Sequence, residues 1–304
     1  MVLDNTSSPN PPPPPAAHIP TAPADHETET STTASTIQAH HPHPPHPSTS
    51  SLGPGLRPLY FAYGSNLSHT QMRQRCTHDP AVSAVPVAIA RLDGEGWRWF
   101  ICERGYANVV PPVGLRVGAQ RGVDDRSLVG AGSEVEDEGV YGVLYDMTPA
   151  DELLLDGYEG VDHAAPPSSG NVGLTPGSGS GSSGPSKAIR PKSQGLGSYN
   201  KWYVPAVVTK WLDDGQRRIR STTTTMTTAN LGSEQAAGGG GEMQTVLVYV
   251  DEERVRVGPP KPEYIGRMER GIREAEALGL PGDWVEGVMR RFLPVPVVPG
   301  GVTA

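Results

Sequence analysis

Apolar residues recur along the chain in about six stretches with the spacing and composition of β-strands. Residues 139–147, GVYGVLYDM, alternate small or apolar side chains between the two faces of a strand, as strands buried on both sides do. Turn residues such as GEG at 94–96 separate neighbouring stretches. The strands predicted in this way lie at 59–63, 82–92, 97–103, 139–147, 201–212 and 243–250.

Helical patterns are fewer. The segment 148–157, TPADELLLDG, has Thr148 as a capping residue and Pro149 in the first turn, and Gly157 is predicted to end the helix. Two more helices are predicted at 262–279 and 283–294, each from its apolar face. The face of the longer one consists of Ile265, Met268, Ile272 and Ala275. Many strands and few helices, without regular strand–helix alternation, predict an α+β fold with a closed or nearly closed sheet and flanking helices.

Several segments lack the apolar residues that a packed core requires. Residues 1–57 are rich in Pro, Ser, Thr and His, so we predict a disordered tail. One domain is predicted over 58–297, followed by a short tail at 298–304. Low-complexity insertions are predicted near 116–134, 163–198 and 217–242, and these belong at loop tips.

Charge and cysteine content narrow the class of protein. The formal net charge of −8 argues against a nucleic-acid partner and gives no attraction to anionic membranes. No stretch approaches the length of a membrane-spanning helix, and the N-terminus has no secretory pattern. The two cysteines, Cys76 and Cys102, fit neither a zinc module nor a disulfide framework. We therefore expect a soluble, cytoplasmic protein, and self-association into a homodimer is left open.

The segment YFAYGSNLS, residues 60–68, is the first candidate for function. Four strand-forming residues run into Gly64, Ser65 and Asn66, which tolerate unusual backbone angles. A turn of this kind after a strand exposes backbone N–H groups that bind an anion or an oxyanion.

The second candidate is Glu159, in LLLDGYEGV at 153–161. A single loop glutamate is usually a solvated side chain. Here Tyr158 and Val161 offer apolar surroundings, and Gly160 permits close approach to the backbone. Burial raises the pKa of a glutamate, which suits a general acid/base near neutral pH.

Taken together, these motifs resemble those of the gamma-glutamylcyclotransferases. The motif YFAYGSN matches at all seven positions, and DGYEGV and the strand carrying VYV follow in the same order. The resemblance extends through ERGYANVVP at 103–111 and the segment from PPKPEY to GDWV, and covers most of 59–297. It implies a small mixed β-barrel with flanking helices and an enzyme that cyclises a γ-glutamyl group, releasing 5-oxoproline and an amino acid.

The resemblance also implies roles for individual residues. Glu159 falls on the family's essential glutamate and would be the general acid/base. The implied substrate-binding residues are Tyr60, Phe61, Ala62, Tyr63, Gly64, Ser65, Asn66 and Tyr249. Because the substrate's own α-amine is the nucleophile, the chemistry requires no metal or organic cofactor. The expected partner is a small-molecule γ-glutamyl substrate.

Several alternatives stay open at this point. Asn66 favours the branch acting on γ-glutamyl amino acids, since the glutathione-specific branch typically has YGSL, but glutathione and γ-glutamyl amines are alternative substrates. Ser65 would be a nucleophile in a hydrolase, although His69, His78 and His163 are not in a suitable motif. Arg73 and Arg75 would meet a substrate carboxylate or lie on a charged helix face. A non-catalytic interaction module, binding partners through the Pro-rich tail, is the rival from another class.

Overall fold

The computed structural model describes residues 56–128, 139–168, 188–229 and 241–294. The chain divides into two units, Met1–Ser48 and Thr49–Ala304, and every described residue lies in the second. Almost all of the predicted tail 1–57, all of 298–304 and parts of the three predicted insertions lie outside the described residues. None of the described helices is long and apolar enough to cross a membrane.

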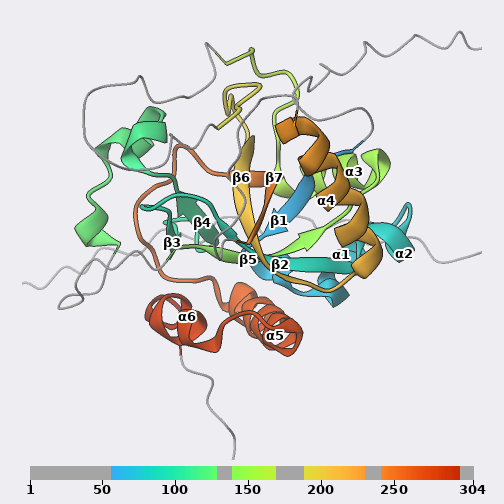
Figure 1. The fold of residues 1–304 in the computed structure, drawn as a ribbon. Helices are drawn as coiled ribbons and strands as arrows, with labels where there is room; N and C mark the ends of the chain where they lie inside the picture. Colours follow the sequence, from blue (N-terminus) through green and yellow to red (C-terminus); the bar gives the residue numbers. More distant parts are fainter. Residues whose placement is uncertain (1–55, 129–138, 169–187, 230–240, 295–304) are drawn as a thin grey trace, which may run out of the picture. The chain divides into compact units, whose positions relative to one another are not determined.

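A closed barrel of five strands forms the centre of the second unit (Figure 1). Its order is β1-β5-β2-β6-β7, and β1 closes it by pairing antiparallel with β5 and parallel with β7. The strands are β1 Leu59–Ala62, β2 Pro86–Leu92, β5 Tyr141–Tyr145, β6 Asn200–Trp211 and β7 Glu242–Val250. Their inward side chains form one buried core, which confirms the predicted α+β barrel with flanking helices.

The predicted stretch 97–103 does not join the barrel. Its ordered part, β3 Arg98–Ile101, pairs with β4 Ala107–Val110 in a separate two-stranded sheet. The barrel therefore has five strands rather than six. The hairpin forms because the chain reverses at once: Gly105 has a φ of +82° and its N–H donates to the carbonyl of Cys102 over 2.7 Å.

Six α-helices are present in the described residues, and short 3₁₀ turns connect several elements. In the view of Figure 1, α5 and α6 lie below the barrel strands, while α3 and α4 lie to their right. Helix α4 enters the segment in which sequence patterns predicted an insertion. The helices are α1 His69–Arg75, α2 Pro80–Ser83, α3 Pro149–Glu159, α4 Asp214–Ala229, α5 Pro262–Leu278 and α6 Gly282–Gly287. The 3₁₀ turns are η1 Ser65–Leu67, η2 Val113–Leu115, η3 Gly118–Gly122, η4 Asp125–Ser127 and η5 Met289–Arg291.

The predicted helix ends differ from the observed ones in two places. Helix α3 passes through Gly157 and ends at Gly160, whose φ of +65° is the left-handed conformation that favours glycine. Glu159 is therefore the last residue of the helix. The predicted helix 283–294 divides into α6 and η5, and Val288 lies between them as the last cap of α6 and the first cap of η5.

The first turn of α3 is fixed to the chain around α2 by Asp151. This fully buried carboxylate accepts hydrogen bonds from the N–H groups of His78 and Asp79, at 2.8 and 2.9 Å, and from the hydroxyl groups of Ser83 and Thr148. Thr148 also caps the helix as predicted, since its hydroxyl accepts from the Asp151 N–H. Burial acts to raise the pKa of Asp151, but these hydrogen bonds outweigh it and lower that pKa.

We expect Asp151→Asn to lower the free energy of unfolding by about 2–3 kcal/mol, because an amide N–H would face buried N–H donors. Urea unfolding at neutral pH measures the loss, and Glu95→Gln, on an exposed turn, is the control. A depressed carboxyl pKa stabilises the fold above the unfolded-state pKa. The difference between wild type and variant should therefore shrink as the pH falls through the folded-state pKa, and a growing difference would contradict this explanation.

Candidate active site

A cavity of about 230 Å³ opens between β1, η1, the end of α3, the β3–β4 hairpin and α5. Its lining combines three arginines, one glutamate and seven tyrosines. The lining residues are Tyr60, Tyr63, Gly64, Ser65, Asn66, Arg75, Arg104, Tyr106, Ala107, Tyr158, Glu159, Gly160, Ser198, Tyr199, Tyr249, Tyr264 and Arg267. Both candidate motifs from the sequence thus contribute to one cavity, although they are about ninety residues apart.

The turn after β1 is held in place by α5. The N–H of Ser65 and the N–H of Ala107 both donate to the hydroxyl of Tyr264, each over 3.3 Å. The N–H groups of Gly64 and Asn66 have no hydrogen-bond partner among the described residues. Of the three N–H groups in the turn, two are therefore available to a ligand, and the third is used to fix the turn.

Asn66 connects the turn to Glu159. Its side-chain amide donates to Glu159 Oε1 over 3.0 Å and to the hydroxyl of Tyr60 over 2.8 Å. Its carbonyl oxygen accepts from Gln71 Nε2 over 2.8 Å, which fixes the orientation of the amide. Asn66 therefore sets the position of the glutamate relative to the turn.

Glu159 is a mostly buried carboxylate with one oxygen occupied and one available. Oε1 accepts from Arg75 Nη1 over 2.9 Å as well as from Asn66. Oε2 has no hydrogen bond to any described residue. The side chain is 15% exposed. Burial raises the pKa of Glu159, while Arg75, Asn66 and Arg267 act to lower it, and the net direction is upward.

The tyrosines of the predicted set are buried and hydrogen-bonded. The Tyr63 hydroxyl donates to the Tyr249 carbonyl, and the Tyr249 hydroxyl donates to Asp156 Oδ1, each over 2.6 Å. The Tyr60 ring packs edge-on against the Tyr249 ring at 5.5 Å. Burial raises the pKa of all three phenols, so they stay neutral.

Two residues of the matched motif lie away from the cavity. Phe61 and Ala62 are fully buried and do not belong to its lining. Side chains alternate along β1, so Phe61 points to the face opposite Tyr60, where its ring approaches Gly142. Both residues pack the barrel core, and an implied role for them in direct substrate contact has no support in this geometry.

Ser65 does not have the partner that a nucleophile needs. Its hydroxyl accepts from Gln71 Nε2 at 2.7 Å and from Arg267 Nη2 at 3.0 Å. Among the described residues no histidine contacts it, since His69 and His163 pair with Glu274 and Asp156 instead. The hydrolase alternative therefore has no general base at Ser65.

Several cavity residues were not predicted from the sequence. They come from the β3–β4 hairpin, the loop before β6 and helix α5, and they are Arg104, Tyr106, Ala107, Ser198, Tyr199, Tyr264 and Arg267.

Arg73 and Arg75 were considered for a substrate carboxylate. Arg73 is exposed, whereas Arg75 pairs with Glu159 and lies 5.1 Å from the centre of the Tyr158 ring. Tyr158 lines the cavity as predicted, but Val161 packs against the core instead.

No protein-family model and no curated protein matches the chain. Two solved structures are similar to it at low identity. One is YkqA from Bacillus subtilis, with a TM-score of 0.41 and 16% identity over 78% of this chain. The chain spans only 55% of the YkqA chain. The other is a yeast gamma-glutamyl cyclotransferase specific to glutathione, with a TM-score of 0.35 and 12% identity over 78% of this chain and 96% of that one.

Proposed function

We propose that this protein is a gamma-glutamylcyclotransferase that converts γ-glutamyl amino acids to 5-oxoproline and a free amino acid. The observation that carries the proposal is the hydrogen bond between Asn66 and Glu159. It joins the two motifs of the family resemblance, YFAYGSN and DGYEGV, in one cavity. The site brings together a carboxylate with a raised pKa and a turn with available N–H groups, as an intramolecular acyl transfer requires.

The charges of the cavity suit a substrate with two carboxylates. Three arginines and one ionised glutamate give the lining a net charge of +2 (three positive, one negative). A γ-glutamyl amino acid has two carboxylates and one ammonium group. The carboxylates are attracted by the arginines, and the ammonium group by Glu159 Oε2. Binding in a folded pose brings the α-amine next to the γ-carbonyl carbon, which raises the effective concentration of the nucleophile.

Glu159 then transfers two protons from the attacking nitrogen to the leaving nitrogen. It takes the first proton from the α-ammonium, and the free amine attacks the γ-carbonyl carbon to form the ring bond. Glu159 gives this proton to the amide nitrogen as the bond to the amino acid breaks. It next takes the surplus proton of the ring nitrogen and passes it to the released amine, after which Glu159 is ionised again.

The negative charge that develops on the carbonyl oxygen needs hydrogen-bond donors. The N–H groups of Gly64 and Asn66 are the available donors in the turn. The substrate supplies the nucleophile, so the proposal assigns no step to a metal or an organic cofactor. Asn66 supports the amino acid branch, because a leucine at this position has no side-chain N–H to hold Glu159 or Tyr60.

The direct test is to incubate the purified full-length protein with γ-glutamyl-alanine, glutathione and γ-glutamyl-ethylamide separately. Mass spectrometry would detect 5-oxoproline. Release from γ-glutamyl-alanine is the expected result. Release from glutathione alone would assign the protein to the glutathione-specific branch, and no product from any of the three would overturn the proposed reaction.

We expect Arg75→Met to move the acid limb of the pH profile of kcat/KM to higher pH. Glu159 acts in its ionised form, and the positive charge of Arg75 acts to lower the pKa of Glu159. Removing that charge raises this pKa further, so activity is lost at a higher pH as the solution is acidified. Arg73→Met is the matched control, because Arg73 is exposed on the same helix. An acid limb that stays in place in Arg75→Met, or moves to lower pH, would contradict this assignment.

A further inference from the structure

Arg104 differs from the other two arginines of the cavity in its contacts. Arg75 donates to Glu159, and Arg267 donates to Ser65 Oγ and to Gln71 Oε1. The Arg104 side chain makes no hydrogen bond to a described residue, and its charged contact is an ion pair with Asp251 Oδ2 at 3.6 Å. Its side chain is 31% exposed. The cavity thus contains one guanidinium group whose N–H donors are largely unused.

The backbone holds this arginine firmly over the cavity. Arg104 lies in the tight turn between β3 and β4, next to Gly105. A Cβ on Gly105 would lie 2.7 Å from Lys261 Cγ and 2.9 Å from Lys261 N, so this turn rests directly on the segment before α5. The N–H of Lys261 donates to the Gly105 carbonyl, and the N–H of Arg256 donates to the Glu103 carboxylate at 2.8 Å. These contacts of the neighbouring residues therefore fix the backbone position of Arg104.

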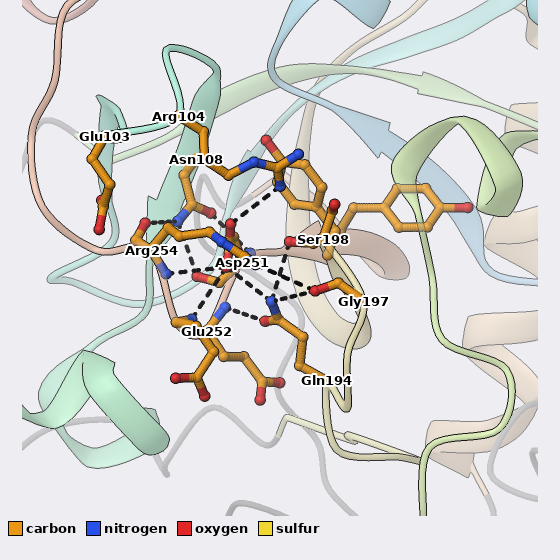
Figure 2. A network of polar contacts seen from close by, with 12 residues as sticks. Glu103, Arg104, Asn108, Gln194, Gly197, Ser198, Asp251, Glu252 and Arg254 are labelled. Atoms are coloured by element: carbon orange, nitrogen blue, oxygen red, sulfur yellow. Dashed lines mark hydrogen bonds and ion pairs between the residues drawn. The ribbon is translucent and has the colours of Figure 1, made fainter. Parts of the chain in front are cut away.

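Asp251, at the end of β7, holds the guanidinium group without cancelling its charge. Figure 2 shows Asp251 between Arg104, Arg254 and Gln194. Asp251 Oδ1 accepts from Gln194 Nε2 at 2.9 Å and lies 3.5 Å from Arg254 Nη1. One buried carboxylate thus faces two arginines, and the group of three retains one positive charge.

Two aromatic rings separate Arg104 from the arginine beside the Gly64–Asn66 turn. Arg267 lies over the Tyr264 ring at 5.2 Å, the Tyr264 and Tyr106 rings meet edge-on at 5.1 Å, and Arg104 lies 5.8 Å from the Tyr106 ring centre. This part of the cavity lining therefore has positive charges at two separate places, Arg267 and Arg104. A γ-glutamyl amino acid likewise has carboxylates at its two ends, on either side of the bond that is broken.

We propose that Arg104 binds the carboxylate of the amino acid that is released, and that Asp251 positions Arg104 for this contact. This inference rests on the proposed function. It assigns the Arg267 side of the cavity, beside Ser65, to the glutamyl end of the substrate, and the Arg104 side to the leaving amino acid. The protein should then discriminate against γ-glutamyl amines, which have no carboxylate on the leaving group, because the guanidinium of Arg104 would stay unpaired.

The test compares γ-glutamyl-alanine with γ-glutamyl-ethylamide, which differ only in the carboxylate of the leaving group. The wild type should favour γ-glutamyl-alanine by about 10- to 100-fold in kcat/KM, the size expected for hydrogen bonds to a charged group. Arg104→Met should lower kcat/KM for γ-glutamyl-alanine to the level of the ethylamide, mainly through KM, and leave the ethylamide value nearly unchanged. Arg104→Lys keeps the positive charge but loses the planar guanidinium group. Its kcat/KM for γ-glutamyl-alanine should therefore lie between those of the wild type and Arg104→Met.

The ethylamide also reports whether the variant is folded and active. Arg73→Met removes a positive charge outside the cavity and should leave the preference intact. Equal turnover of both substrates by the wild type, or an equal loss for both in Arg104→Met and Arg104→Lys, would overturn the role of Arg104 while the proposed reaction stands. Turnover of neither substrate by the wild type would overturn the proposed function itself.

Discussion

Glu159→Gln should lower kcat by about 1,000-fold or more, within the range that removal of a general acid/base produces. Glutamine has the same shape, and its Oε1 can still accept from Asn66 and Arg75, which hold the carboxylate in the wild type. It cannot take a proton from the α-ammonium or return one to the leaving amine. The rate of 5-oxoproline release from γ-glutamyl-alanine at saturating substrate measures the effect.

The stability of this variant separates a catalytic role from a structural one. Burial raises the pKa of Glu159, which means that the folded protein disfavours the ionised carboxylate. Replacing it by a neutral amide should therefore leave the free energy of unfolding unchanged or raise it. Glu276→Gln, at an exposed position of α5, is the control for both measurements. A Glu159→Gln protein with near-normal turnover would show that another group carries the protons.

Local patterns predicted six of the seven described strands but only three of the six described α-helices, because these patterns depend on neighbouring residues alone. Alternation along 139–147 and the apolar face of 262–279 each correspond to an observed element, β5 and α5. Membership of the barrel was harder to predict. The stretch 97–103 has the same composition as a barrel strand, and only its reversal at Gly105 pairs it with β4 instead.

The end of α3 shows why a helix boundary depends on distant contacts. Gly157 and Gly160 are equally suitable in sequence. A Cβ on Gly157 would meet no atom within 4 Å, whereas a Cβ on Gly160 would lie 3.1 Å from Ser198. Close packing against the loop before β6 therefore accompanies the left-handed turn at Gly160. Whether the helix ends at Gly157 or at Gly160 decides whether Glu159 belongs to a loop or to the helix.

The candidate site was only partly accessible to sequence reasoning. YFAYGSN and EGV stood out as motifs, but their proximity was implied by resemblance and not by any local signal. Arg104, Tyr264 and Arg267 lie in segments that have the patterns of an ordinary hairpin turn and an amphipathic helix. Their roles depend on contacts across the fold, such as the hydrogen bond from Ser65 N–H to the Tyr264 hydroxyl.

Gly64→Ala should lower kcat by about 100-fold, the size of effect that a displacement of about 1 Å causes at a reacting centre. The φ of Gly64 is −112°, outside the left-handed region that favours glycine. The obstacle is space, because the new Cβ would lie 2.9 Å from the Tyr264 hydroxyl and 3.3 Å from Ala107 Cβ. Both neighbours are buried, so the turn must move and take its N–H groups with it.

Gly157→Ala is the matched control on the helix that carries Glu159. An added Cβ there meets nothing within 4 Å, and alanine favours the helix by about 0.5–1 kcal/mol, so this variant should be as active as the wild type and slightly more stable. Wild-type turnover in a folded Gly64→Ala protein would contradict the assigned role of the turn. The charge on the carbonyl oxygen would then have to be stabilised by other donors of the cavity, and the arginines are the groups with the charge to do so.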